Sequence, residues 1–156
     1  MARWIPVTMF LLSAGPAFAG APGQKTPASP VWREECSSCH VAYPPRLLPA
    51  ASWRAVMAGL KTHFGTDASV DAKTATAIEQ FLVANAGMRP MRSVDGTPSL
   101  RITTTPWFVR KHDEVSASAW KRPEVKSAAN CTACHAGAEG DNFSDDSSGR
   151  SGGRRR

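Results

Sequence analysis

The chain has 156 residues, of which 42% are hydrophobic, and a formal net charge of +6. This length suffices for one domain or two small lobes. The positive charge favours an acidic partner or an anionic lipid surface over nucleic acid, because no nucleic-acid-binding motif is present. Beyond the N-terminus, no segment approaches the roughly 20 apolar residues of a membrane-spanning helix.

The first residues have the pattern of a secretory signal peptide. Arg3 supplies a positive charge, residues 5–14 are largely apolar, and residues 17–19 form a small-x-small cleavage signal. We therefore expect cleavage after Ala19 and a periplasmic location, with an uncleaved anchor as the alternative. Residues 20–30, rich in Pro, Gly, Ala and Ser, are predicted to form a linker.

Two runs of the form Cys-x-x-Cys-His contain all the cysteines of the chain. This spacing is typical of a c-type haem attachment site. Each thiol can add to one vinyl group of the haem, while the imidazole that follows ligates the iron from the proximal side. The sequence therefore predicts two covalent haems c, attached at Cys36, Cys39, Cys131 and Cys134, with His40 and His135 as proximal ligands.

Two other uses of these cysteines are possible. Four thiols can form two disulfides in any of three connectivities, or together bind one zinc ion. Neither alternative gives a reason for a histidine directly after each pair, so covalent haem is the favoured interpretation.

The first haem site is predicted to lie in a helical lobe spanning residues 31–87. A short helix over residues 32–40 is expected to carry the motif. Prolines then interrupt the helical pattern in residues 41–49 and predict a loop over the haem edge. This loop contains Tyr43.

Two longer helices are expected to complete this lobe. From about Ala51, apolar residues recur at helical spacing, and the stripe ends near His63 and Phe64. The next helix is predicted to begin near Asp67 or Ser69 as its cap and to end near Gly87. Helices in this order after the motif favour a class I cytochrome c-like lobe.

Residues 88–142 are predicted to form a second haem-binding lobe with little regular structure. Thr105 as N-cap and Pro106 at the first helical position predict a short helix that leads to His112. Residues 143–156 are rich in Ser, Asp, Gly and Arg and are expected to be a polar tail. The predicted fold class is mainly α.

The chain has four histidines, two of which belong to the motifs. The remaining two, His63 and His112, match the two irons and predict bis-histidine coordination, with these as distal ligands. Proximity in sequence favours His63 for the first haem and His112 for the second, although crossed pairing is also possible. The competing ligands are methionines, namely Met57, Met88 and Met91.

Residues 120–130, which run into the second motif, resemble the small periplasmic dihaem cytochromes c. The resemblance extends back through residues 106–108 and His112, and more loosely to Glu35, Cys36 and residues 53–63. It implies a two-lobed, low-potential electron carrier with bis-histidine haems. It also implies electron transfer between a membrane b-type cytochrome and a high-spin, oxygen-binding c-type cytochrome.

The predicted function is therefore transfer of single electrons, without enzymatic activity. The rival hypothesis is a haem enzyme or a gas or redox sensor in which one iron has an open or displaceable axial position. A third possibility is a subunit tethered to a larger oxidoreductase.

Overall fold

The computed structural model describes residues 26–89 and 97–144, and the fold within them is mainly helical. The predicted signal peptide, most of the predicted tail and Met91 lie outside these residues. The described residues contain five α-helices and five short 3₁₀ turns, and no β-strand. No helix among the described residues combines the length and apolar character needed to span a bilayer. The helices are α1 (Pro30–Cys36), α2 (Ala50–Ala58), α3 (Ala72–Ala84), α4 (Pro106–Lys111) and α5 (Ala117–Trp120).

The first haem motif lies at the end of helix α1 and in the turn after it. The Ser29 side chain caps the helix by accepting a hydrogen bond from the Trp32 amide, and Pro30 occupies the first turn. We expected a helix over residues 32–40, whereas α1 ends at Cys36. The Ser38 hydroxyl donates to the Glu35 carbonyl at 2.8 Å, a local bond that competes with continued helix. The rest of the motif is therefore a turn.

Helix α2 ends before the predicted stripe does. The helix stops at Ala58 with Gly59 as its C-cap, and a 3₁₀ turn over Leu60–Thr62 follows. His63 comes directly after this turn, and the chain reverses there because Phe64 and Gly65 both have positive φ angles, of 49° and 98°. Phe64 is consequently 49% exposed instead of belonging to the core.

The cap of α3 is Asp71, not Asp67 or Ser69. Its carboxylate accepts hydrogen bonds from the Lys73 and Thr74 amides, both at 3.0 Å. The Asp67 carboxylate accepts from the Ser69 amide at 2.9 Å and so forms a separate turn. A short polar side chain can either cap a helix or close a turn. Asp71 is the cap because the backbone is still extended there and becomes helical only at Ala72.

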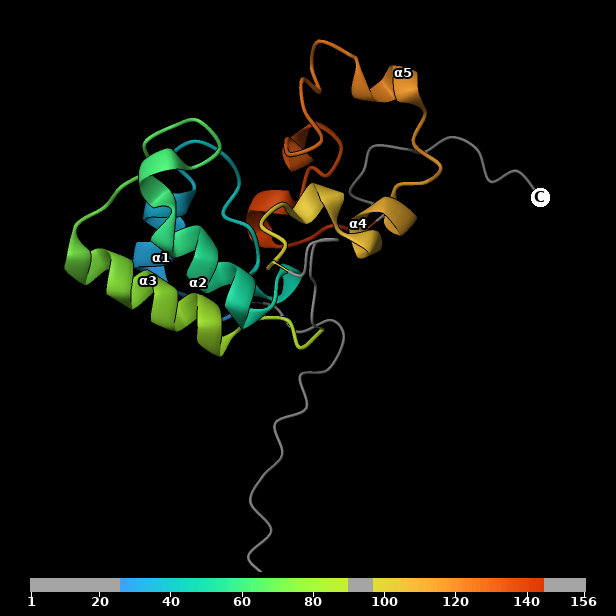
Figure 1. The fold of residues 1–156 in the computed structure, drawn as a ribbon. Helices are drawn as coiled ribbons and strands as arrows, with labels where there is room; N and C mark the ends of the chain where they lie inside the picture. Colours follow the sequence, from blue (N-terminus) through green and yellow to red (C-terminus); the bar gives the residue numbers. More distant parts are fainter. Residues whose placement is uncertain (1–25, 90–96, 145–156) are drawn as a thin grey trace, which may run out of the picture.

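Helix α3 packs against both α1 and α2, and the three helices lie together on one side of the molecule (Figure 1). Trp32 of α1 contacts Phe81 of α3 with ring centroids 5.1 Å apart. The Trp53 indole of α2 donates to the Pro45 carbonyl at 2.6 Å, which satisfies a buried donor. The buried hydrophobic core consists of Trp32, Ala42, Leu48, Trp53, Ile78 and Leu82.

Residues after α3 return to the loop that follows the first motif. The Gly87 amide donates to the Leu48 carbonyl at 2.9 Å. A Cβ atom at Gly87 would lie 2.3 Å from the backbone oxygen of Arg46. Only glycine permits this close approach of two backbone segments.

We predict that Gly87→Ala lowers the free energy of unfolding by roughly 1–3 kcal/mol, because the backbone must shift to accept the methyl group. Guanidinium unfolding of the haem-loaded protein measures the change. Gly140→Ala is the matched control, since a Cβ there meets no atom within 4 Å; its effect should stay within about 0.5 kcal/mol. Equal losses in the two variants would contradict the explanation.

The C-terminal part contains only short helical elements. Thr105 caps α4 by accepting from the Phe108 amide at 3.2 Å, with Pro106 at the first helical position, which confirms the predicted start. His112 is the residue at the end of this helix. Phe108, Val125 and Ala138 are the buried hydrophobic residues of this part.

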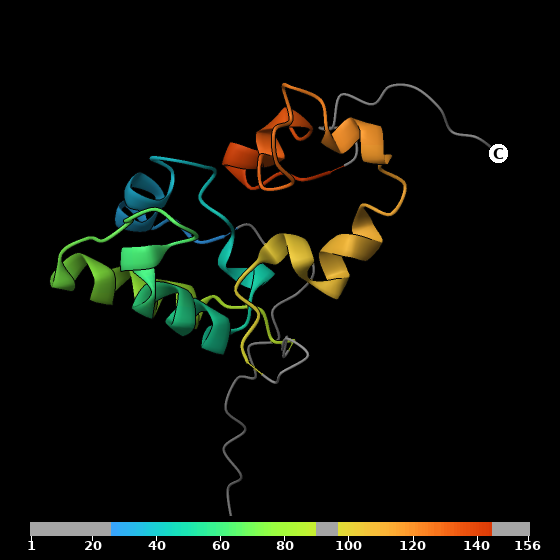
Figure 2. The ribbon, with the colours of Figure 1, turned by 45° about the horizontal axis from the view of Figure 1, so that its top comes forward.

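The segment that contains the second motif lies between the two groups of helices. Figures 1 and 2 show this segment, coloured red, between α1–α3 and the pair α4 and α5. The Arg33 guanidinium donates to the Glu139 carbonyl at 2.7 Å. The two motifs are thus held close to each other.

A second contact joins the same regions through Asp141, whose side chain is only 8% exposed. Its carboxylate forms an ion pair with Arg46 and accepts from the amide and hydroxyl of Thr26 at 3.0 and 2.7 Å. Burial alone would raise the pKa of Asp141. The hydrogen bonds from Arg46 and Thr26, together with the positive charge of Arg46, outweigh burial, so the pKa lies below its ordinary value.

This depressed pKa gives a pH-dependent stability. The ordinary carboxyl pKa is about 3.9, so the stabilisation by Asp141 is complete above that pH and is lost as the pH falls through the lower folded value. We predict that Asp141→Asn costs about 1 kcal/mol at neutral pH. The difference from the wild type should shrink in acid, as measured by urea unfolding at several pH values.

Glu139→Gln is the control for this prediction, because it removes a negative charge from the same turn at an exposed position. It should change stability little at any pH. A loss in Asp141→Asn that is independent of pH would contradict the role assigned to the carboxylate.

Candidate haem-binding site

The first pair of predicted ligands is brought together across the N-terminal part. The imidazole centroids of His40 and His63 lie 6.2 Å apart, with an angle of 33° between the ring planes. The Nδ1 atom of His40 donates to the Val41 carbonyl at 2.8 Å. A carbonyl oxygen can only accept, so Nδ1 carries the hydrogen and Nε2 keeps its lone pair.

The second pair is brought together in the C-terminal part. The imidazole centroids of His112 and His135 lie 6.1 Å apart, with the ring planes at 89°. The Nδ1 atom of His112 donates to the Phe108 carbonyl at 2.9 Å. The His112 ring also stacks on the Phe108 ring, with centroids 4.0 Å apart. This bond and this stacking fix the orientation of the His112 ring and leave its Nε2 lone pair available.

These separations suit an iron ion between the rings of each pair. An imidazole nitrogen binds a transition metal at about 2.0–2.1 Å, and its ring centre lies roughly 1 Å further out, so two rings on opposite sides of one metal ion have centroids about 6 Å apart. Both observed distances agree with this value. The residues present therefore fit a bis-histidine metal centre at each of the two positions.

His63 has the protonation state that metal binding requires. Burial lowers its pKa, and the neighbouring His40 and Arg101 lower it further. Arg101 lies next to the turn after His63, with its guanidinium carbon 4.0 Å from the centroid of the Phe64 ring. The imidazole is consequently kept neutral, and its lone pair is free to bind metal.

None of the four cysteines is paired in a disulfide. Burial and, to a lesser extent, Glu35 raise the pKa of Cys36 to about 11, and burial also raises the pKa of Cys131. No cluster of three or more His, Cys, Asp or Glu side chains that could hold a metal ion is found among the described residues. The disulfide and all-thiolate zinc alternatives are thus not formed in this part of the chain.

A hollow of about 710 Å³ separates the two motifs. It is lined by residues 37–42 on one side and by residues 129–132 on the other, with Lys126 and Ser127 beside them. Neither His63 nor His112 contributes to it. The hollow therefore lies between the segments that carry the two motifs.

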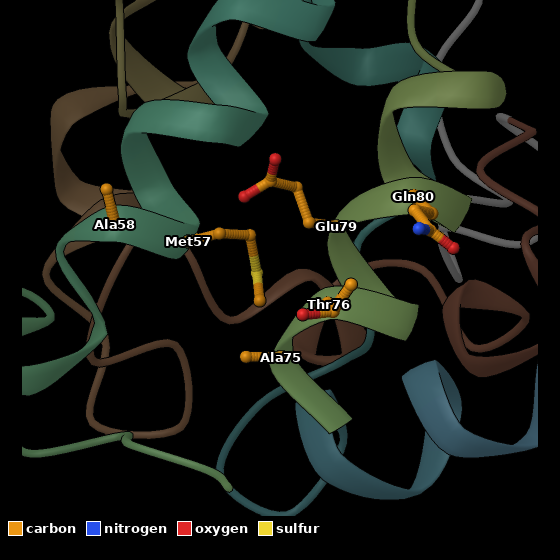
Figure 3. Close-up of a pocket in the computed structure, with 6 residues that line it drawn as sticks. All are labelled: Met57, Ala58, Ala75, Thr76, Glu79 and Gln80. Carbon is orange, nitrogen blue, oxygen red and sulfur yellow. The ribbon is translucent and has the colours of Figure 1, made fainter. Parts of the chain in front are cut away.

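Two of the three competing methionines lie in described residues. Met57 lines a groove of about 250 Å³ between α2 and α3, and Figure 3 shows its side chain extending toward Ala75 and Thr76. None of the four histidines lines this groove. Met88 is 80% exposed on the surface. Neither side chain is placed between the rings of a histidine pair.

Several contacts of the histidines were not anticipated from the sequence. The Tyr43 ring stacks on His40 with centroids 4.7 Å apart, and Phe143 packs edge-on against His135 at 5.7 Å. Phe143 begins the predicted tail, so ordered packing extends into it. The Phe108 carbonyl orients the His112 ring, while the neighbouring Asp113 and Glu114 are exposed. The only sign of the hydrogen bond from His112 to the Phe108 carbonyl in the sequence was the predicted position of His112 at the end of a helix.

Comparison with known proteins identifies the family. Residues 32–143 match the family described as dihaem cytochrome c. The chain belongs to this family. No match is found among curated proteins.

Solved structures agree with this assignment. A structure of DHC purified from Rhodobacter sphaeroides is 51% identical, covers 73% of this chain and 96% of its own, and superposes with a TM-score of 0.64. A diheme cytochrome c from the same organism is 47% identical over 74% and 97% of the two chains, with a TM-score of 0.66. A diheme cytochrome type c from Shewanella baltica is 39% identical over 76% and 89%, also with a TM-score of 0.66.

Membership of the family settles the cofactor class. A dihaem cytochrome c is an electron-transfer haem protein with two covalently bound haems c, and the four cysteines of this chain supply the attachment points. The predicted fold class, mainly α, is likewise confirmed. The boundaries predicted for the two lobes stay predictions.

We predict that haem remains on the polypeptide after acid–acetone extraction, because thioether bonds survive unfolding whereas axial ligation does not. Mass spectrometry of the denatured chain should show the mass of two haems. A Cys131→Ala, Cys134→Ala double variant should retain one haem. Complete extraction of haem from the wild type would contradict covalent attachment.

Proposed function

We propose that this protein transfers single electrons between redox partners in the periplasm through two low-spin, bis-histidine haems. The observation that carries the proposal is the occurrence of two histidine pairs with centroids 6.2 and 6.1 Å apart, each containing the histidine of one Cys-x-x-Cys-His motif.

The proposed roles follow the two motifs. The first haem is attached at Cys36 and Cys39, with His40 as proximal and His63 as distal ligand. The second is attached at Cys131 and Cys134, with His135 as proximal and His112 as distal ligand. Each distal histidine is the neighbour of its proximal partner in space and the nearer one in sequence.

Haem held by these residues would supply reversible one-electron chemistry. Ligation by two histidines at each site would leave no place for oxygen or peroxide to bind, which favours electron transfer over ligand activation. Histidine in place of methionine also lowers the reduction potential. The chain keeps the His40 and His112 imidazoles oriented through their Nδ1 hydrogen bonds to backbone carbonyls.

The proposed location and partners rest on the sequence. The predicted signal peptide supports export, and attachment of haem c in bacteria occurs outside the inner membrane. The resemblance stated above supports a membrane b-type cytochrome as electron donor and a high-spin, oxygen-binding c-type cytochrome as acceptor. The basic surface residues are suited to acidic docking faces on such proteins.

Optical and EPR spectra of the purified protein test the proposal. We expect two low-spin ferric signals and no change when carbon monoxide is added to the reduced protein. The ring planes differ between the pairs, at 33° and 89°. The first site should therefore give an ordinary rhombic signal, and the second a highly anisotropic one. A high-spin signal or a carbon monoxide shift in the wild type would overturn the proposal in favour of an enzyme or sensor.

Replacing each distal histidine assigns the ligands. His63→Ala should convert only the rhombic signal to high spin, and His112→Ala only the anisotropic one, with both haems still attached. Met88→Ala is the control, because this methionine is 80% exposed, and it should leave both low-spin signals unchanged. A low-spin spectrum that persists in both histidine variants would refute the assignment.

A further inference from the structure

Tyr43 is the only tyrosine of the chain and lies between the two haem motifs. Its ring stacks on the His40 imidazole with centroids 4.7 Å apart and the planes at 27°. Its hydroxyl donates to the Ala129 carbonyl at 2.7 Å. One side chain thus touches the proximal histidine of the first motif and the backbone that leads into the second.

The Ala129 carbonyl extends this contact to the second motif itself. The same oxygen accepts a hydrogen bond from the Cys131 amide at 3.0 Å. A continuous series of contacts therefore runs from the His40 ring, through the Tyr43 ring and hydroxyl and the Ala129 carbonyl, to the cysteine that attaches the second haem.

The position of Tyr43 is fixed by its surroundings. The half-buried ring packs against the hydrophobic core, and the two prolines that follow are both buried and restrict the backbone. These contacts hold the hydroxyl within hydrogen-bond distance of the Ala129 carbonyl.

The space around this series of contacts makes it distinctive. The hollow of about 710 Å³ has His40 on one wall and Ala129 and Cys131 on the other. Tyr43 joins these walls through its ring stack on His40 and its hydrogen bond to the Ala129 carbonyl.

We propose that Tyr43 is the coupling residue between the two haem sites, and that electrons pass between them along the path from His40 through Tyr43 and Ala129 to Cys131. The step is a one-electron exchange in which one iron changes from ferrous to ferric and the other from ferric to ferrous. No bond forms or breaks, and no proton moves. Tyr43 itself is not oxidised. The inference rests on the proposed function, because it requires a haem at each motif.

The decisive variant is Tyr43→Phe, which keeps the ring on His40 and removes only the hydrogen bond to Ala129. The rate of electron exchange between the haems, measured by pulse radiolysis of the haem-loaded protein, should fall severalfold. The two midpoint potentials and the low-spin EPR signals should stay unchanged. Tyr43→Leu, which also removes the stacked ring, should lower the rate further.

Asp141→Asn is the matched control, because it weakens another contact between the same regions that does not join haem-attaching groups. Its exchange rate should equal that of the wild type. Pulsed EPR supplies the distance between the two irons in each variant, and this distance should not change in Tyr43→Phe. An equal fall in rate in Asp141→Asn, or a longer distance in Tyr43→Phe, would overturn the proposal, since Tyr43 would then act only by fastening the two parts together.

An unchanged exchange rate in Tyr43→Phe would overturn the bridge through Tyr43 while leaving the proposed function intact. A wild-type protein without two low-spin haems would refute both.

Discussion

The bond between an imidazole nitrogen and iron is the interaction on which we expect the rest of this structure to depend. Each proposed centre needs two histidine rings about 6 Å apart, so that a nitrogen of each can reach the same iron. The chain meets this need twice, with different elements: turns on both sides of the first pair, and a helix end and a turn for the second. The small hydrophobic core positions these turns.

The small size of this core explains why two large apolar cofactors suit the chain. The buried cluster of the N-terminal part contains six residues, and the C-terminal part adds only short helices around Phe108, Val125 and Ala138. Short helices of this kind are marginal by themselves. Haem supplies apolar surface on which such elements can pack, and covalent attachment keeps it in place.

Contacts between the two parts have distinct physical roles. The ion pair of Arg46 with Asp141 joins the 3₁₀ turn after the first motif to the chain near its last described residue, and it depends on charge. The Tyr43 hydrogen bond joins groups next to the haem-binding residues and does not depend on charge. This division lets the parts be held together by one contact and coupled electronically by another.

Local sequence patterns determined much of the chemistry. Haem attachment depends on residues within five consecutive positions, so the two motifs were visible without a fold. The start of α4 was also local, since Thr105 and Pro106 act on their own helix. The extent of α1 and the cap of α3 were predicted wrongly, because Ser38, Asp67 and Asp71 can each bond to the backbone in more than one way.

Only the tertiary structure decided which side chains meet. The sequence contained the right number of histidines, but their pairing depends on how the turn before His63 and the end of α4 fold back toward the motifs. The contact from Tyr43 to Ala129 joins residues 86 positions apart in sequence. No periodicity or spacing encodes such a contact, because it arises from the packing of distant segments.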